Sequence, residues 1–246
     1  MTPATKDFCH QIQDDGFALL EDVFNQSGIE EILREIDCSI ENDLDGIKNS
    51  RGQTYAARNV SKNNPRLLEC WKKPILLELV HEVLGPQAGL VRILFFDKHP
   101  DRTWSLPWHK DVTIAVKDNQ LPTNHFSKPT IKSGVPHVHA STEVLSDMLT
   151  LRIRLDEITQ HNGPLQVARG SHKNGKAAST DNQAVTVLSS AGAVLAMRPL
   201  LSHASESSTA GCTDHRRILH LEFASSPLLP DEYQWHEFWP VNSQAI

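Results

Sequence analysis

Closely spaced cysteines are missing from this sequence of 246 residues. The four cysteines that it has, Cys9, Cys38, Cys70 and Cys212, lie far apart and form no Cys-x-x-Cys pair. A small disulfide-stapled domain and a thiolate zinc site both need such spacing, so the sequence argues against both. We expect reduced thiols in a cytoplasmic protein.

Basic residues are too few for a protein whose main partner is a nucleic acid. Asp and Glu total 30 whereas Lys and Arg total 24, which gives a formal net charge of −6. No positive excess is therefore present to neutralise phosphates. The sequence also has no apolar run long enough to span a bilayer, and residues 1–15 lack the apolar centre of a signal peptide. We expect neither a nucleic acid nor a membrane as partner.

The length of the chain suits one large domain with its own core. We predict a single domain over 1–246. Within it, helical support is expected over about 1–88 and a β core over about 89–224. Residues 117–147 contain several Pro and Gly residues and no clear period. An irregular insertion of this length is usually a functional lid or a disordered loop.

Two helices and a strand are predicted in the first third of the chain. Residues 16–20 are a short apolar run that is typical of a strand. A helix is predicted from Ser27, because Ser27 and Glu30 match a capping box. A second helix is predicted over 74–84, with Pro at its first turn and Gly-Pro at its end.

The rest of the chain is rich in short β-like segments separated by turn residues. Strands are predicted at 90–96, 108–116, 149–155, 164–168, 184–188, 193–197 and 216–223. Many short strands in one chain favour an all-β barrel or sandwich core.

His109 and Asp111 are the first candidates for a metal site. Alternate residues of a strand point to the same face, so a strand over 108–116 would aim both side chains into one space. Two histidines and one carboxylate with open positions suit Fe(II). Zinc more often recruits thiolates or a third histidine, and magnesium or calcium needs more oxygen ligands. A His-x-Asp triplet alone is common, so a second histidine is required.

His203 is the candidate for that second histidine. It follows an apolar strand and a proline turn, among small residues that leave room for a metal. It is one of 13 histidines, so only the combination with His109 and Asp111 selects it. His172 is a competing choice, but its place in Gly-Ser-His after a short strand favours a turn-capping role.

Arg216 begins a strand in which Arg216, Ile218, His220 and Glu222 share one face. A buried guanidinium needs an anionic partner and binds a carboxylate well. A dicarboxylate that chelates iron at one end and meets Arg216 at the other would supply this partner. The alternative is a strand end at the surface, with Arg216 and Arg217 both solvated.

Further candidates come from strand parity. Arg152 belongs to the polar face of the strand over 149–155, and this face lines a cavity or is solvated, with equal weight for both. Thr113 shares the expected face of His109 and Asp111, so it is a candidate for a hydrogen bond to such a dicarboxylate. Lys98 and His137 are candidates near the insertion, but both are expected at the surface.

Four segments in order carry a resemblance to a known family: WHKD, NGPLQVARGSH, GAVLAMRPLLSHAS and HRRILHLEFA. Together they resemble the phytanoyl-CoA dioxygenase family of Fe(II)/2-oxoglutarate-dependent oxygenases, over about 16–223. The resemblance implies a mainly β fold, a double-stranded β-helix (a jelly-roll or cupin-like barrel) with flanking N-terminal helices. The ligands and contacts that it implies are His109, Asp111 and His203 for iron, Arg216 for the distal carboxylate of 2-oxoglutarate, and Arg58 and Arg152 as further contacts.

The resemblance also implies an oxidoreductase, a dioxygenase that uses O2 and 2-oxoglutarate and releases succinate and CO2. Related halogenases replace the metal-binding carboxylate by a small residue, so the presence of Asp111 favours hydroxylation. Arg169 stands where the family commonly has proline, which affects the turn more than the chemistry. The substrate is expected to be an unidentified small molecule, anionic if Arg58 and Arg152 face the cavity. Acyl-CoA is less expected, because the sequence has no evident basic groove for its phosphates.

Two other functions are compatible with parts of the pattern. A non-catalytic β-helix module that binds metal or ligand would have the same fold without turnover. A zinc hydrolase would use the histidines and the carboxylate but would leave Arg216 without a role.

Overall fold

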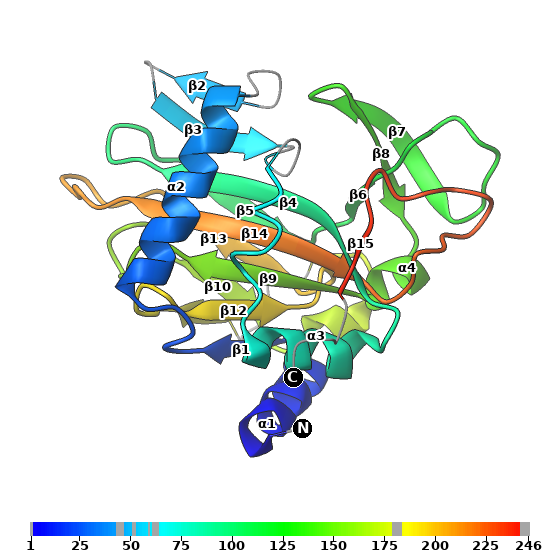
Figure 1. Ribbon diagram of the computed structural model, residues 1–246, viewed down its shortest axis with the longest axis horizontal. Helices are drawn as coiled ribbons and strands as arrows, with labels where there is room; N and C mark the ends of the chain where they lie inside the picture. Colours follow the sequence, from blue (N-terminus) through cyan, green and yellow to red (C-terminus); the bar gives the residue numbers. More distant parts are fainter. Residues whose placement is uncertain are drawn as a thin grey trace.

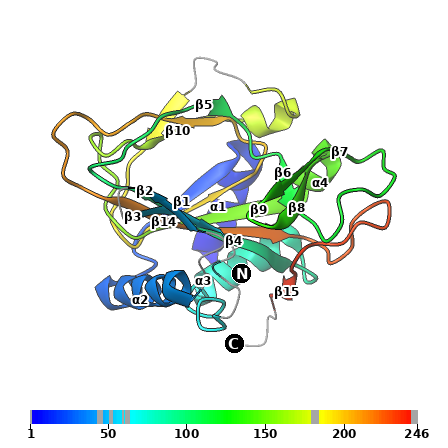
Figure 2. The same ribbon diagram turned by 90° about the horizontal axis from the view of Figure 1, so that it is seen from above.

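Two antiparallel sheets face each other and form the centre of the fold (Figures 1 and 2). The computed structural model describes residues 2–42, 47–50, 53–58, 60, 64–178 and 184–241. The large sheet has the order β1 (Phe17–Leu20), β12 (Val194–Met197), β9 (Met148–Arg154), β14 (Arg216–Ala224), β4 (Gly89–Lys98), β3 (Gln53–Arg58) and β2 (Ile47–Ser50), and β15 (Trp239–Pro240) pairs with β4. The small sheet has the order β11 (Ala184–Val187), β10 (Leu165–Ala168), β13 (His203–Ser205) and β5 (Leu106–His109).

This arrangement confirms the predicted mainly β fold of the double-stranded β-helix type. The strands predicted over 90–96, 149–155 and 216–223 correspond to β4, β9 and β14. β4 is mostly apolar between Gly89 and Phe96, with Arg92 as the one charged residue in that stretch, and it packs on the helices with one face while its other face lines the space between the sheets. Among the described strands, the two facing sheets do not close into a barrel.

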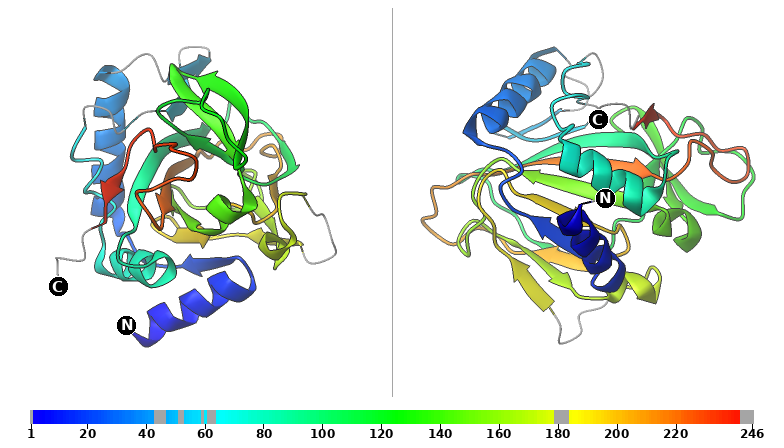
Figure 3. Two further views of the ribbon diagram at one scale, coloured as in Figure 1. Left: turned by 90° about the vertical axis from the view of Figure 1, so that its right-hand side faces the viewer. Right: turned by 60° about the horizontal axis from the view of Figure 1, so that its bottom comes forward.

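Helices cover the face of the large sheet that points away from β5 and β10 (Figure 2). α2 (Gln26–Asn42) and α3 (Pro74–Leu84) lie there, and α1 (Pro3–Asp14) packs beside α3 (Figure 3). The largest apolar core lies between these helices and the sheet, with the Trp71 and Phe223 rings 4.9 Å apart at their centroids. α3 has the predicted bounds, with Pro74 in its first turn and Gly85 at its end with φ of 87°.

The N-terminal third departs from the sequence-based prediction in two ways. The strand predicted at 16–20 is confirmed as β1, but β2 and β3, which also join the large sheet, and α1 were not predicted. α2 begins at Gln26 and not at Ser27. The Asn25 side chain accepts a hydrogen bond from the Gly28 amide at 3.0 Å, so Asn25 caps this helix and the predicted capping box is wrong.

The segment 117–147 is not irregular as predicted. It contains β7 (Phe126–Lys132), β8 (Val135–Ala140) and α4 (Thr142–Ser146). The two strands form a hairpin that joins β6 (Thr113–Ala115) in a third sheet and projects at one end of the large sheet (Figure 1). A separate apolar core supports this hairpin. In this core the ring centroids of Phe126 and Tyr233 are 4.3 Å apart. A role of this segment as a lid stays a prediction.

No helix in the described part of the chain is both long and apolar enough to cross a membrane.

Truncation of the main core tests the packing of the large sheet on the helices. Leu219 of β14 is 0% exposed in this core. We expect Leu219→Ala to lower the free energy of unfolding by about 2–5 kcal/mol, since it loses apolar contacts and leaves a cavity. Leu228→Ala is the matched control, because Leu228 is 80% exposed. Denaturant unfolding of both variants measures the difference, and equal stabilities would contradict this packing.

Candidate functional site

A cavity of about 390 Å³ lies between the large and small sheets. Most of its polar wall comes from the inner face of the large sheet, and the opposite wall comes from the small sheet and the loop after β5. The polar residues include Arg58, Arg92, Arg152, Arg216, His220 and Glu222 on the first side, His109, Lys110, Asp111, His203 and Ser205 on the second, and Thr113 and Lys132 from the third sheet. The cavity therefore collects residues from distant parts of the sequence.

His109, Asp111 and His203 come together at this cavity. One possible ligand atom from each lies within 4.8 Å of the others. His109 ends β5 and His203 begins β13, and the two are direct partners in the register of this strand pair. Their ring centroids are 4.2 Å apart, and Asp111 Oδ2 lies 3.6 Å from His203 Nε2.

Asp111 reaches this group in a way that the sequence did not predict. The strand expected over 108–116 is interrupted, because β5 ends at His109 and β6 begins at Thr113. Asp111 lies in the connecting segment, where its amide donates to the Pro199 carbonyl at 3.0 Å. The same-face argument for His109 and Asp111 is therefore wrong, and the irregular segment between the two strands presents the carboxylate.

Each histidine ring is fixed by a backbone carbonyl. His109 Nδ1 lies 2.7 Å from the Pro107 oxygen, and His203 Nδ1 lies 2.9 Å from the Leu201 oxygen. A carbonyl only accepts, so each Nδ1 carries the proton and each Nε2 keeps its lone pair. Such bonds hold a histidine in the tautomer and orientation that bind a metal through Nε2.

The electrostatics favour the protonation states that bind a metal. Burial lowers the pKa of His203 to about 4, which keeps its imidazole neutral at pH 7. Burial alone would raise the pKa of Asp111, but the neighbouring His203, His220, Arg152 and His109 outweigh it and lower this pKa to about 2. The neutral imidazole of His203 and the ionised carboxylate of Asp111, next to an open cavity and to the Nε2 atom of His109, fit Fe(II).

Arg216 faces the cavity and Arg217 faces away from it. Arg216 is 4% exposed, and its Nε and Nη1 atoms have no hydrogen-bond partner among the described residues. Burial, and then the positive charge of Arg152, lower its pKa to about 9. Arg217 instead bonds Asp156 through Nη2 at 2.7 Å. The guanidinium of Arg216 thus needs an anion, whereas that of Arg217 is already paired with the Asp156 carboxylate.

The other predicted contacts, Thr113, Arg58 and Arg152, all line the same cavity. Arg152 thus lies on a polar face that points inward, so the cavity-facing alternative for β9 is the observed one. Burial lowers the pKa of both Arg58 and Arg152. Neither guanidinium forms a hydrogen bond with another described residue.

An ion pair at the cavity wall was not predicted. Arg92 Nε donates to Glu222 Oε2 at 2.9 Å, and Arg92 Nη2 contacts the other carboxylate oxygen. The same Nη2 donates to the Thr113 carbonyl at 3.2 Å, and His220 Nε2 lies 3.1 Å from Glu222 Oε1. Alternation along β14 could have indicated one partner of this ion pair, since Glu222 shares the inner face with Arg216 and His220.

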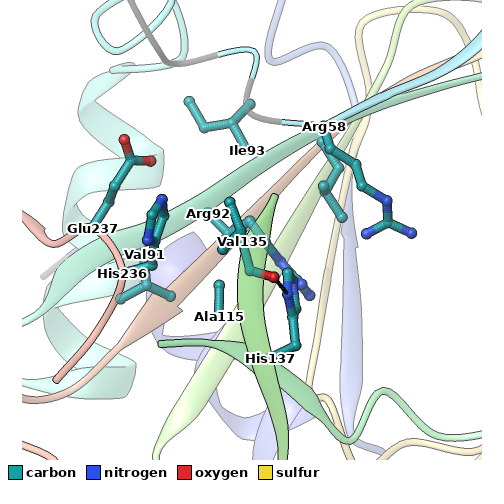
Figure 4. A pocket seen from close by; sticks show the side chains of 10 residues that line it. Arg58, Val91, Arg92, Ile93, Ala115, Val135, His137, His236 and Glu237 are labelled. Atoms are coloured by element: carbon teal, nitrogen blue, oxygen red, sulfur yellow. Dashed lines mark hydrogen bonds between the residues drawn. The ribbon is translucent and has the colours of Figure 1, made fainter. Parts of the chain in front are cut away.

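Lys98 and His137 are both buried, so the prediction that they lie at the surface is wrong. Lys98 is 1% exposed in β4, and its ammonium donates to Ser205 Oγ at 3.0 Å and to the Glu206 carbonyl at 2.6 Å. His137 of β8 lies beside Arg92 in a second, smaller pocket under the hairpin, where Nδ1 contacts the Val135 carbonyl at 2.8 Å (Figure 4). Both side chains are covered by segments distant in sequence.

The two remaining sequence motifs serve the architecture. His172 lies in a short 3₁₀ turn, η1 (Ser171–Asn174), and contacts the Gln13 carbonyl at 3.2 Å, outside the lining of the cavity. The Asn162 side chain accepts from the Thr159 amide at 3.0 Å and donates to the Glu157 carbonyl at 2.8 Å, which closes the Asn-Gly turn.

The sequence model described as phytanoyl-CoA dioxygenase matches residues 12–217. The chain belongs to the phytanoyl-CoA dioxygenase family. It is accordingly a non-haem oxygenase that depends on Fe(II) and 2-oxoglutarate. No curated protein matches the chain in sequence.

Solved structures agree in fold at low sequence identity. AviO1 from Streptomyces viridochromogenes Tue57 is 20% identical, with a TM-score of 0.63 over 94% of this chain and 100% of its own. EctD from S. alaskensis with bound Fe is 17% identical, with a TM-score of 0.68 over 91% of this chain and 76% of its own. SnoN, an α-ketoglutarate-dependent epimerase from nogalamycin biosynthesis, is 15% identical, with a TM-score of 0.63 over 90% of this chain and 80% of its own.

Replacement of the carboxylate tests the metal centre. We expect Asp111→Ala to weaken Fe(II) binding by more than the 10–100-fold that is typical of outer-shell changes, because it removes an ionised ligand. Asp118→Ala is the control, since Asp118 is exposed and its carboxylate only accepts from the Gln120 amide. Anaerobic titration calorimetry with Fe(II) measures both affinities. Unchanged binding in Asp111→Ala would place the metal elsewhere.

Proposed function

We propose that this oxygenase hydroxylates a small anionic molecule and releases succinate and CO2. One observation carries the proposal: the two histidines and the carboxylate share one cavity with a buried Arg216, two of whose guanidinium nitrogens have no hydrogen-bond partner among the described residues. A dicarboxylate that bridges a metal and Arg216 would satisfy both groups at once.

His109, Asp111 and His203 would hold the iron. Iron, dioxygen and 2-oxoglutarate together supply the oxidising power that converts a substrate C–H bond to C–OH while 2-oxoglutarate becomes succinate and CO2. The protein's part is to bind the reactants in one orientation and to keep water out. The two backbone carbonyls that fix the histidine rings serve this purpose before any ligand arrives.

Arg216 would bind the distal carboxylate of 2-oxoglutarate, and Thr113 would give a second contact to it. Ser205, which sequence reasoning missed, is a further donor. Its Oγ accepts a hydrogen bond from Lys98, so its own hydroxyl proton is left to donate into the cavity. Arg216 and Ser205 approach from opposite sheets and would enclose the carboxylate between them.

The charge of the remaining wall favours an anionic substrate. Arg92 is neutralised by Glu222, and Lys110 bonds two backbone carbonyls outside the metal group. Arg58 and Arg152 are left with no carboxylate bonded to them among the described residues. A substrate carboxylate or phosphate would pair with them. The cavity volume of about 390 Å³ is in the range of small-molecule pockets, which favours a small metabolite over acyl-CoA.

Apolar side chains complete the cavity and predict the rest of the substrate. Phe96, Trp104 and Leu106 line it together with Leu94 and Leu165. A substrate with an apolar or ring-shaped body and one anionic group would match this wall. Hydroxylation is preferred over halogenation because Asp111 occupies the position that a halide would need. Since the similar fold of SnoN belongs to an epimerase, the fold alone does not select hydroxylation.

Anaerobic absorbance spectroscopy tests the cosubstrate site. We expect Fe(II) and 2-oxoglutarate to give a weak metal-to-ligand charge-transfer band. The band should be lost in His109→Ala and need at least about tenfold more 2-oxoglutarate in Arg216→Ala, because one charge-assisted hydrogen bond or more is removed. Arg217→Ala is the matched control and should titrate as the wild type. Absence of the band in folded wild-type protein would favour the non-catalytic binding module, as would absence of succinate after oxygen is added.

A substrate screen with Arg152→Ala tests the anionic group. For a substrate found by succinate release, we expect its KM to rise about 10–100-fold in Arg152→Ala, the cost of losing a hydrogen bond to a charged group. Fe(II) binding should be unchanged, because Arg152 is not among the three ligands. Arg66→Ala is the control, since the Arg66 side chain is 83% exposed. An unchanged KM, or equal turnover of an uncharged analogue, would contradict an anionic substrate.

A further inference from the structure

Lys98 lies behind the wall of the cavity at the end where Arg216 enters. The two residues are direct partners in the register of β4 and β14, so their side chains leave the large sheet on the same face. Lys98 is not part of the cavity lining, yet its ammonium bonds Ser205, which is part of it. A charged group is thus one hydrogen bond away from the expected position of the distal carboxylate.

The hydrogen bonds of Lys98 determine which way the Ser205 hydroxyl can donate. The ammonium has only donors, and two of them point at Ser205 Oγ at 3.0 Å and at the Glu206 carbonyl at 2.6 Å. Ser205 Oγ must therefore act as an acceptor toward Lys98. Its proton is directed away from the ammonium, and the cavity that it lines with Arg216 is open to it.

A glycine keeps the space that this arrangement needs. Gly163, in the Asn-Gly turn, has φ of 70°, and a Cβ there would lie 2.5 Å from the Glu206 carbonyl and 3.1 Å from Lys98 Nζ. Any other residue would push on both partners of the Lys98–Glu206 hydrogen bond. The turn motif thus contributes to the position of the ammonium as well as to the path of the chain.

The charges around Lys98 also favour a bound anion. Burial and the positive charges of Arg216 and Arg152 lower the pKa of Lys98 to about 7. No carboxylate is bonded to Lys98 in the part of the chain that the structure describes. An anion held between Arg216 and Ser205 would relieve this accumulation of positive charge.

We propose that Lys98 is a positioning residue for 2-oxoglutarate: its ammonium fixes Ser205 so that the serine hydroxyl donates to the distal carboxylate bound by Arg216. The proposal rests on the proposed function, and it adds a residue that does not itself touch the cosubstrate. Lys98 acts through Ser205 and through its charge.

Binding measurements with two oxo acids, 2-oxoglutarate and 2-oxopentanoate, distinguish this positioning role from a purely structural role. 2-Oxopentanoate has the chain length of 2-oxoglutarate without the distal carboxylate. In anaerobic titrations of the Fe(II)-loaded protein, we expect Lys98→Met to weaken 2-oxoglutarate binding by about tenfold, the effect of losing one hydrogen bond to a charged group. Binding of 2-oxopentanoate should be unchanged. Lys117→Met is the control, since Lys117 Nζ only contacts the Gln234 side chain at 3.1 Å.

A double variant tests whether the effect passes through Ser205. If it does, the loss of 2-oxoglutarate affinity in the double variant Lys98→Met with Ser205→Ala should be smaller than the product of the fold-losses measured in the two single variants. If Lys98→Met does not fold, Lys98→Gln removes the charge while keeping a polar group, and the same selective loss is expected.

The proposal is overturned if Lys98→Met binds 2-oxoglutarate as the wild type does, or if it loses affinity equally for both acids. Full additivity with Ser205→Ala would overturn the route through the serine. A missing absorbance band in the wild type would instead reject the proposed function and this inference together. A normal band with an unaffected Lys98 variant would reject this inference alone.

Discussion

The antiparallel pairing of β5 with β13 places His109 directly opposite His203, and most of the site depends on this register. A shift by one residue would turn either histidine to the other face of its strand and separate the two imidazoles. β13 also contributes Ser205, two residues beyond His203 and on the same face. The strand pair therefore positions metal ligands and a cosubstrate contact in a single step, and the loop that contains Asp111 only has to close one side.

Opposite this strand pair, the large sheet holds positive charge that its own residues do not neutralise. Arg216 and Arg152 point into the cavity, and Arg154 is completely buried with no hydrogen-bond partner among the described residues for its three guanidinium nitrogens. Such charges are costly without anions. The cost is acceptable if the native protein works with an anion between its sheets, and the binding energy of that anion then also stabilises the fold. The ion pair of Arg92 and Glu222 shows the contrasting case, in which the wall neutralises itself.

The sequence predicted those parts of the site that depend on local pattern. Alternation along β14 put Arg216 and Arg217 on opposite faces, the family resemblance selected Arg216, and Pro74 and Gly85 set the ends of α3. Contacts between distant segments were not predictable in this way. The Asp111 backbone is held by the Pro199 carbonyl, and the hairpin after β6 gains its core from the C-terminal Tyr233 and Trp235. Lys98 was expected at the surface because the segment that buries it lies more than a hundred residues away.

Different parts of the two sheets hold the metal site and face the substrate, which explains how one fold can serve different reactions. The two histidines and Arg216 are placed by strand pairing, which would let related proteins keep the metal and the oxo acid in one place. Arg58 and Arg152 are placed by strand pairing too, at the end of β3 and in β9, but no carboxylate among the described residues is hydrogen-bonded to their guanidinium groups, which face the cavity. Changes at these two positions would alter which molecule is presented to the metal without moving the metal itself. Under the proposed function, these two arginines are the positions that would select the substrate.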